Sequence, residues 1–222
     1  MESYIKKTKL AGALISLGLF SVVGAAQATI LEIDFTTAGA FSGTAPSSPG
    51  SNTIFATAVF DDHNSTGSVT LTMSVLSNLS SGAYVNDWYF NSTTAPLTTI
   101  NFVSGTQASS VDSGTNAFKA DGIGGNFDVA FHFPTNNPGE LAQGHTSVYT
   151  LIDAGLTANS FNAVSVPAPN GGGYLSALHV QGYGNSVWVS GDPAATRVPE
   201  PATLALLGLG LLGIAATRAR RK

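Results

Sequence analysis

The chain has 222 residues, contains no cysteine and carries a formal net charge of −4 at pH 7. The lack of cysteine excludes disulfides, cysteine-based metal sites and thiol catalysis. Between residues 29 and 201 the sequence holds twelve Asp and Glu residues against one lysine and one arginine, Lys119 and Arg197. Nucleic-acid binding depends on clustered Lys and Arg, so this acidic composition excludes that class of function.

Residues 1–28 predict a cleaved secretory signal peptide. Three lysines lie close to the start, residues 10–24 are apolar or small, and Ala26 and Ala28 complete an A-x-A cleavage site. A positive segment, a short apolar core and a small-residue exit are typical of such signals. We therefore expect an N-terminal signal helix, with the secretion machinery and signal peptidase as partners.

Residues 29–190 predict a single domain built from strands. In residues 68–76, apolar side chains alternate with Thr and Ser, and residues 127–133 and 174–181 show the same period of two. This alternation indicates half-buried strands. The other expected strands are 30–35, 53–61, 84–90, 98–103, 147–152, 160–165 and 186–189.

Gly-, Asn- and Pro-rich turns separate these segments. About ten short strands joined in this way predict an all-β fold, an antiparallel β-sandwich of jelly-roll type. Residues 191–197 are interpreted as a linker between this domain and the C-terminal segment.

The C-terminal segment combines a polar motif, an apolar stretch and a basic tip. The motif is Val198, Pro199, Glu200 and Pro201, and residues 202–217 are 16 residues without a charge. At about 1.5 Å per residue a helix of this length reaches roughly 24 Å, close to the ~30 Å of a bilayer core. We therefore predict a transmembrane helix in the inner membrane, with the basic tip in the cytoplasm. That tip contains Arg218, Arg220, Arg221 and Lys222.

This order of motif, apolar stretch and basic tip resembles the PEP-CTERM sorting signal of exported proteins from Gram-negative, exopolysaccharide-producing bacteria. The resemblance implies processing at residues 198–201 by an exosortase-type membrane protease, followed by sorting to the cell surface or extracellular matrix. Residues 88–91, 118–122 and 179–182 also resemble uncharacterised extracellular domains that accompany this tail.

Two acidic groups suggest a calcium site, with Ca²⁺ as the candidate cofactor. Asp61 and Asp62 close a predicted strand, and Asp121, Asn126 and Asp128 surround a glycine-rich turn. Carboxylate and amide oxygens are ligands that Ca²⁺ prefers. The alternative is that these side chains cap turns by accepting hydrogen bonds from nearby backbone groups. The sequence leaves both interpretations open.

No pattern in the sequence identifies a catalytic residue. The four histidines form no H-E-x-x-H motif, and no G-x-S-x-G elbow selects a nucleophile. His132 and His179 fall on the polar side of predicted strands, where ordinary surface histidines also lie. We therefore expect a non-enzymatic protein.

Two aromatic side chains, Tyr183 and Trp188, are candidates for stacking on sugar rings. The alternative for both is core packing, which we expect for Trp88 because large aromatic side chains dominate cores. The leading hypothesis is an exported structural or polysaccharide-binding protein of the surface or matrix, with exopolysaccharide as a partner. The rivals are a hydrolase acting on matrix polysaccharide and a self-assembling adhesive or ice-associated surface protein.

Overall fold

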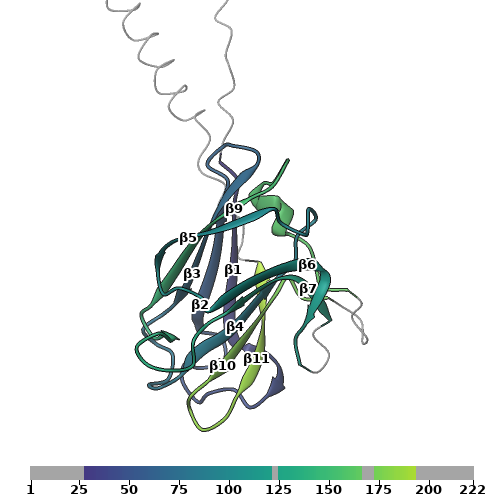
Figure 1. Ribbon diagram of the computed structural model, residues 1–222. Coiled ribbons are helices and arrows are strands. Elements are labelled where there is room, and N and C mark those ends of the chain that lie inside the picture. The colour runs from purple at the N-terminus through teal and green to yellow at the C-terminus, as the bar shows by residue number, and fades with distance from the viewer. Residues whose placement is uncertain (1–27, 122–124, 167–172, 194–222) are drawn as a thin grey trace, which may run out of the picture.

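The computed structural model describes residues 28–121, 125–166 and 173–193. Eleven strands form one antiparallel sheet that curves back on itself into two layers (Figure 1). The strand order is β5-β9-β3-β2-β1-β11-β10-β4-β7-β6, and β8 pairs with β4. The strands are β1 (Ile30–Gly43), β2 (Ile54–Asp61), β3 (Ser68–Val75), β4 (Tyr84–Phe90), β5 (Thr99–Gly105), β6 (Ser110–Lys119), β7 (Asn126–His132), β8 (Leu141–Ala142), β9 (Thr146–Ile152), β10 (Ser176–Gln181) and β11 (Val187–Pro193).

Strand β1 connects the two layers. It pairs with β2 through Ile30–Thr36 and with β11 from Ile33 to Gly43, with register shifts between Phe35 and Ser42. An extra residue at such a shift bends the strand and increases its twist. Gly39 lies in the bend, where an added Cβ would come within 2.5 Å of the Ser190 carbonyl oxygen. Glycine therefore allows β1 to approach β11 closely as the sheet turns.

The main hydrophobic core lies between the layers. Trp88 is fully buried there, and its ring meets Phe35 edge to face with 5.1 Å between centroids. The indole Nε1–H donates a hydrogen bond to Ser176 Oγ at 3.2 Å, and the Ser176 hydroxyl donates to the Tyr89 carbonyl at 2.6 Å. The expectation of a core position for Trp88 is confirmed.

The prediction of an antiparallel all-β fold is also confirmed, but the detail differs. A single path of paired strands includes both layers because β1 pairs with β2 and with β11. This nearly closed arrangement does not establish the jelly-roll topology that the sequence predicted. Strand β1 is also longer than predicted, at 14 residues.

One local prediction is wrong, and two strands, β6 and β8, were not predicted. The strand expected at 160–165 is instead a short 3₁₀ helix, η1 (Ala158–Phe161), capped by reciprocal bonds between Thr157 and Ser160. Strand β6 was not predicted, because its polar sequence shows no alternation around Gly114. Both faces of β6 are largely exposed, so no hydrophobic period marks it in the sequence.

The predicted linker begins too early. Residues Gly191, Asp192 and Pro193 belong to β11 and pair with Phe35, Asp34 and Ile33 of β1. Gly, Asp and Pro are common in turns, which is why the sequence suggested a boundary here.

Several predicted features lie outside the described residues. They are the signal helix with Ala26, the sorting motif, the apolar segment 202–217 and the basic tip. The structure therefore shows neither predicted helix. Within the described ranges, no helix has the length and apolar character needed to cross a membrane.

Candidate binding face on the outer side of the sheet

One cross-strand row on the outer face of the sheet brings a carboxylate and two histidines together beside a tryptophan. Trp188 of β11 lies opposite His179 of β10, and His179 lies opposite Asp87 of β4. Asp87 in turn lies opposite His132 of β7, which pairs with Ser110 of β6. Successive side chains of a strand point to opposite faces of the sheet. On β10, β4 and β7, a residue adjacent to each member of the row therefore points inward. Those inward neighbours are Leu178, Trp88 and Phe131, which are fully buried in the main core.

The Asp87 carboxylate lies between the two histidines. His132 Nδ1 donates to Asp87 Oδ1 at 2.6 Å, and His179 Nδ1 lies 3.3 Å from Asp87 Oδ2. Burial by itself raises the pKa of Asp87, but hydrogen bonds and charge interactions with both histidines outweigh it and lower the pKa to about 2. Asp87 is therefore ionised throughout the ordinary pH range.

His132 lies between two carboxylates. The hydrogen bond from its ring to Asp87 raises the pKa of His132, and burial opposes this effect. Its other ring nitrogen, Nε2, lies 3.9 Å from Asp112 Oδ2, at the more exposed end of the row. The arrangement favours the protonated imidazolium because two negative groups flank it.

An outer aromatic cluster lies beside this row and is separate from the main core. Tyr89 is at its centre, between Ala177 and Ala130 on the neighbouring strands. The small methyl groups leave room for the phenol ring, which contacts Trp188 at 5.1 Å between centroids. Burial, followed by the negative charge of Asp87, raises the pKa of Tyr89 to about 12. The cluster comprises Tyr89, Ala120, Phe127, Ala130, Ala177 and Trp188, with Phe41, Phe118 and Tyr174 packed against it.

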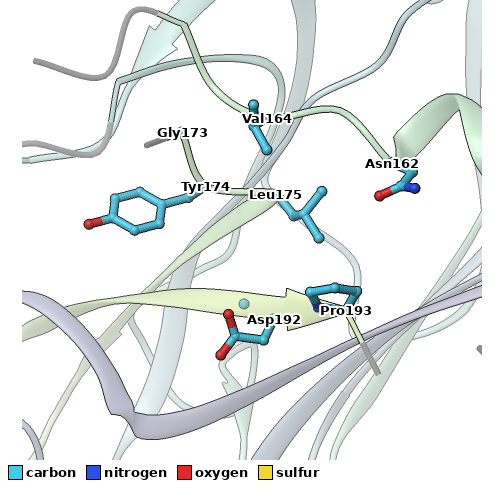
Figure 2. A pocket seen from close by; sticks show the side chains of 8 residues that line it. Asn162, Val164, Gly173, Tyr174, Leu175, Asp192 and Pro193 are labelled. Atoms are coloured by element: carbon cyan, nitrogen blue, oxygen red, sulfur yellow. The ribbon is translucent and has the colours of Figure 1, made fainter. Parts of the chain in front are cut away.

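A hollow opens at the far end of β11 from Trp188 (Figure 2). Its volume is about 350 Å³, and Asn162, Val164, Tyr174, Leu175, Asp192 and Pro193 line it. Figure 2 shows Leu175 between Asn162 and Pro193, while the Asp192 carboxylate and the Tyr174 ring point to the other side. That ring stacks on Phe41 with 4.7 Å between centroids, so Tyr174 connects the lining of the hollow to the outer aromatic cluster.

The predicted calcium ligands do not come together in one cluster. Asp61 and Asp62 lie at the end of β2, whereas Asn126 and Asp128 lie on β7, and four strands separate β2 from β7 in the sheet order. Asp121 is exposed on the chain between β6 and β7. Among the described residues, no group of three or more His, Asp or Glu side chains is placed to hold a metal ion.

Asp62 and Asp128 instead accept hydrogen bonds from backbone N–H groups, most of them in distant segments of the chain. Asp62 accepts hydrogen bonds from the backbone N–H groups of Thr29, Asn64 and Ala158. Asp128 accepts from Ser92 at 3.0 Å and from Asn116 at 2.7 Å. These bonds use the oxygens that a cation would need, in line with the capping alternative.

The two aromatic side chains proposed for sugar stacking differ in exposure, because Trp188 is buried and Tyr183 is half-buried. Trp188 is only 7% exposed, and the His179 imidazole covers one face of the indole with 4.6 Å between centroids. Tyr183 packs against the main core and donates its hydroxyl hydrogen to the Thr44 carbonyl. The burial of Trp188 is in line with the packing alternative, whereas sugar stacking by the half-buried Tyr183 stays a prediction.

The Asp87–His132–His179 arrangement was not predicted from the sequence. His132 and His179 were each placed correctly on the polar side of a strand, but their shared partner Asp87 lies on a third strand. The hollow was also missed, because it joins η1, the approach to β10 and the end of β11.

The part of the chain that follows β11 defines the class of protein: a strand-built domain followed by a C-terminal sorting segment. Residues 197–222 match the family described as the PEP-CTERM protein-sorting motif. The chain thus carries a PEP-CTERM sorting signal, which supports an exported protein that an exosortase, a membrane protein, sorts towards the surface. No curated protein and no solved structure matches the chain. The family match covers the tail, so the role of the β domain rests on its own geometry.

Proposed function

We propose that the β domain is a non-enzymatic surface or matrix module that binds polysaccharide in the hollow between η1 and the end of β11. The observation that carries this proposal is the mixed lining of the hollow. Asp192 and Asn162 line the hollow together with the apolar residues Leu175 and Pro193. Sugars present hydroxyl groups at their edges and C–H groups on their faces, and this lining supplies partners for both.

The polar groups of the hollow suit hydroxyl recognition. Asp192 accepts hydrogen bonds, and the Asn162 amide both donates and accepts them. A volume of about 350 Å³ lies at the small end of ordinary ligand sites, which run from about 300 to 1,000 Å³. A binding unit of one or two sugar rings is therefore expected.

The charge of the domain narrows the class of polysaccharide. The described residues contain eleven Asp and Glu residues and a single lysine, Lys119. A uronic-acid polymer would be repelled by this surface, whereas a neutral or amino sugar would not. The preferred ligand is a neutral or cationic polysaccharide, and calcium would be needed only for an acidic one.

Binding without turnover is supported by the acidic side chains of the hollow. Asp192 is the one carboxylate among the described residues that line it. Glycoside hydrolysis ordinarily uses a pair of carboxylates on either side of the scissile bond. A module of this kind is therefore expected to retain its ligand unchanged.

A glycan array tests this function directly. The full chain is applied with Ca²⁺ and with EDTA, and each bound glycan is then incubated and analysed for new reducing ends. We expect retention of neutral or amino glycans in both conditions and no product. Asp192→Asn and Asn162→Ala should each weaken binding about tenfold, whereas Asp112→Asn, which removes an exposed carboxylate outside the hollow, should not. Release of shorter sugars would contradict the binding function and indicate a hydrolase instead.

A further inference from the structure

We propose that cleavage of the signal peptide after Ala28 completes the β domain, because the new α-ammonium group of Thr29 forms an ion pair with the buried carboxylate of Asp62. Ala26 and Ala28 form the predicted A-x-A exit, so cleavage there makes Thr29 the first residue of the mature chain. In the structure, the Thr29 backbone N–H donates a hydrogen bond to Asp62 Oδ1 at 2.9 Å. Cleavage therefore turns a neutral donor that already contacts Asp62 into a cation.

The cleavage step places the positive charge on one known atom. One water molecule is consumed as the amide bond between Ala28 and Thr29 breaks. The oxygen of the water remains on the Ala28 carboxylate, which leaves with the signal peptide, and both protons of the water end on the Thr29 nitrogen. An α-amino group has an ordinary pKa of about 7.7–8.0, so most of it is protonated at pH 7. The resulting ammonium keeps a hydrogen that it can donate to Asp62.

The fold holds Thr29 against Asp62 from both sides of the residue. Besides the bond from its N–H group, the Thr29 carbonyl oxygen accepts a hydrogen bond from the Asp62 N–H at 3.3 Å. Strand β1 begins at the next residue, Ile30, which pairs with Asp61 of β2. The mature chain therefore enters the sheet directly after its first residue. Thr29 is exposed, so water can accept the remaining ammonium hydrogens.

Asp62 is a carboxylate that lacks a positive partner in the precursor. It is only 5% exposed, and its oxygens accept hydrogen bonds from the backbone N–H groups of Thr29, Asn64 and Ala158. These three donors are neutral amides. Burial of a carboxylate has a large desolvation cost unless an opposite charge offsets it. An ammonium group at the Thr29 nitrogen would supply that charge without any movement of the chain.

The surrounding elements bring no other cation to Asp62. The ion pairs within the described ranges do not include this carboxylate. His63, the next residue, lies 3.2 Å from Asp61 instead, and its side chain is 64% exposed. Strands β1 and β2 and the η1 helix contain no lysine, arginine or histidine. The mature N-terminus is thus the positive group that the fold directs to Asp62.

The ion pair makes the processed domain more stable than its precursor. A chain that keeps residues 1–28 has a neutral amide at Thr29, whereas the processed chain has a charged donor at the same position. Hydrogen bonds between charged groups are roughly twice as strong as those between neutral ones. The contact also joins the start of β1 to the end of β2 and to the first residue of η1. Cleavage therefore stabilises the domain only once export has removed the signal peptide.

A double-mutant cycle on the exported chain tests the ion pair. Mass spectrometry should find Thr29 at the N-terminus of the wild type and an uncut chain in Ala28→Leu, which lacks the small exit residue. In urea titrations, Asp62→Asn should raise the unfolding equilibrium constant about fivefold more in the processed chain than in the uncut chain. Asp61→Asn, the control on the neighbouring carboxylate, should act equally in both. Equal effects of Asp62→Asn, a different mature N-terminus, or continued cleavage of Ala28→Leu would overturn the proposal.

Reactivity of the N-terminal amine tests the proposal in the processed wild type, even if Asp62→Asn does not fold. The chain is acetylated briefly at pH 7, folded and in urea, and the label on each amine is measured by mass spectrometry. An opposite charge raises the pKa of the Thr29 amine and reduces its reactive neutral form. Labelling of Thr29 should therefore be about tenfold slower in the folded chain, whereas the exposed Lys119 should change less than about twofold. Equal labelling of Thr29 in both states would contradict the ion pair.

Discussion

The imidazole of His132 and the carboxylate of Asp87 form a hydrogen bond of 2.6 Å between β7 and β4. Because Asp87 also contacts His179, one carboxylate connects three neighbouring strands. The side chains of Asp87, His132 and His179 thus connect β4, β7 and β10 on the outer face, in addition to the backbone hydrogen bonds of the sheet. We call this set of contacts the electrostatic tie.

This tie predicts a pH-dependent stability. The pKa of His132 is raised in the folded protein, so its stabilising effect is complete below the unfolded value near 6.5 and is lost as pH rises through the folded value. The free energy of unfolding should therefore exceed that of His132→Gln by more at pH 5.5 than at pH 8.5. Urea titrations at the two pH values measure the difference. In an Asp87→Asn background the extra stabilisation at low pH should be much smaller, and its full persistence would assign it to another group.

Asp87 contributes with the opposite pH dependence. Its folded pKa is about 2 against an ordinary 3.8, so its effect is present above pH 3.8 and is lost as pH falls towards 2. Asp87→Asn should lower the free energy of unfolding at pH 6 by about 1–3 kcal/mol, the usual cost of losing charged hydrogen bonds. Asp112→Asn removes a more exposed carboxylate and should cost less than about 0.5 kcal/mol. Equal costs for the two variants would show that the tie is unimportant.

The Trp88–Ser176 hydrogen bond makes a prediction about the core. Ser176→Ala leaves the buried Trp88 Nε1–H without the acceptor it has in the structure and should destabilise the domain by about 1–3 kcal/mol. Ser110→Ala, on the exposed edge strand β6, is the matched control and should be nearly neutral. Thermal unfolding followed by circular dichroism measures both. A neutral Ser176→Ala would show that another group satisfies the indole.

The bend in β1 predicts a strong effect at one glycine. In Gly39→Ala the new Cβ meets the Ser190 carbonyl oxygen, so the β1–β11 pairing must shift, at a cost of about 1–3 kcal/mol. Gly50→Ala places the same methyl group in open space and should be within about 0.5 kcal/mol of the wild type. The denaturation midpoints of the two variants measure this difference. Similar midpoints would show that the close approach of β1 to β11 at Gly39 does not limit stability.

The sorting motif predicts a processing defect. Replacing Pro199, Glu200 and Pro201 with alanine removes the segment that an exosortase recognises, within the matched range 197–222. The variant should accumulate as a longer, membrane-held precursor in its native cells. Mass spectrometry of the fractionated protein provides the measurement. If the mass and location of the variant matched those of the wild type, the motif would not be needed for processing.

The strands with clear alternation could be predicted from the sequence, but their registers could not. Residues 68–76 predicted β3 closely because one of its faces is buried. Residues 127–133 predicted β7 closely although both of its faces are buried, since large apolar residues still alternate with Asp128, Ala130 and His132. The meeting of Asp87, His132 and His179 depends on which residues pair across three strands, and no local pattern encodes that choice. Strand β6 escaped prediction for the opposite reason, since neither of its faces is buried enough to impose a period.

The central claim is that the hollow beside η1 is the polysaccharide site. The most direct measurement is an NMR titration of the isotope-labelled full chain with the neutral or amino glycan that the array selects. The account predicts saturable shifts at Asn162, Leu175 and Asp192, with a midpoint at about tenfold higher glycan concentration in Asp192→Asn. Shifts confined to another face, with these three residues unmoved, would contradict it.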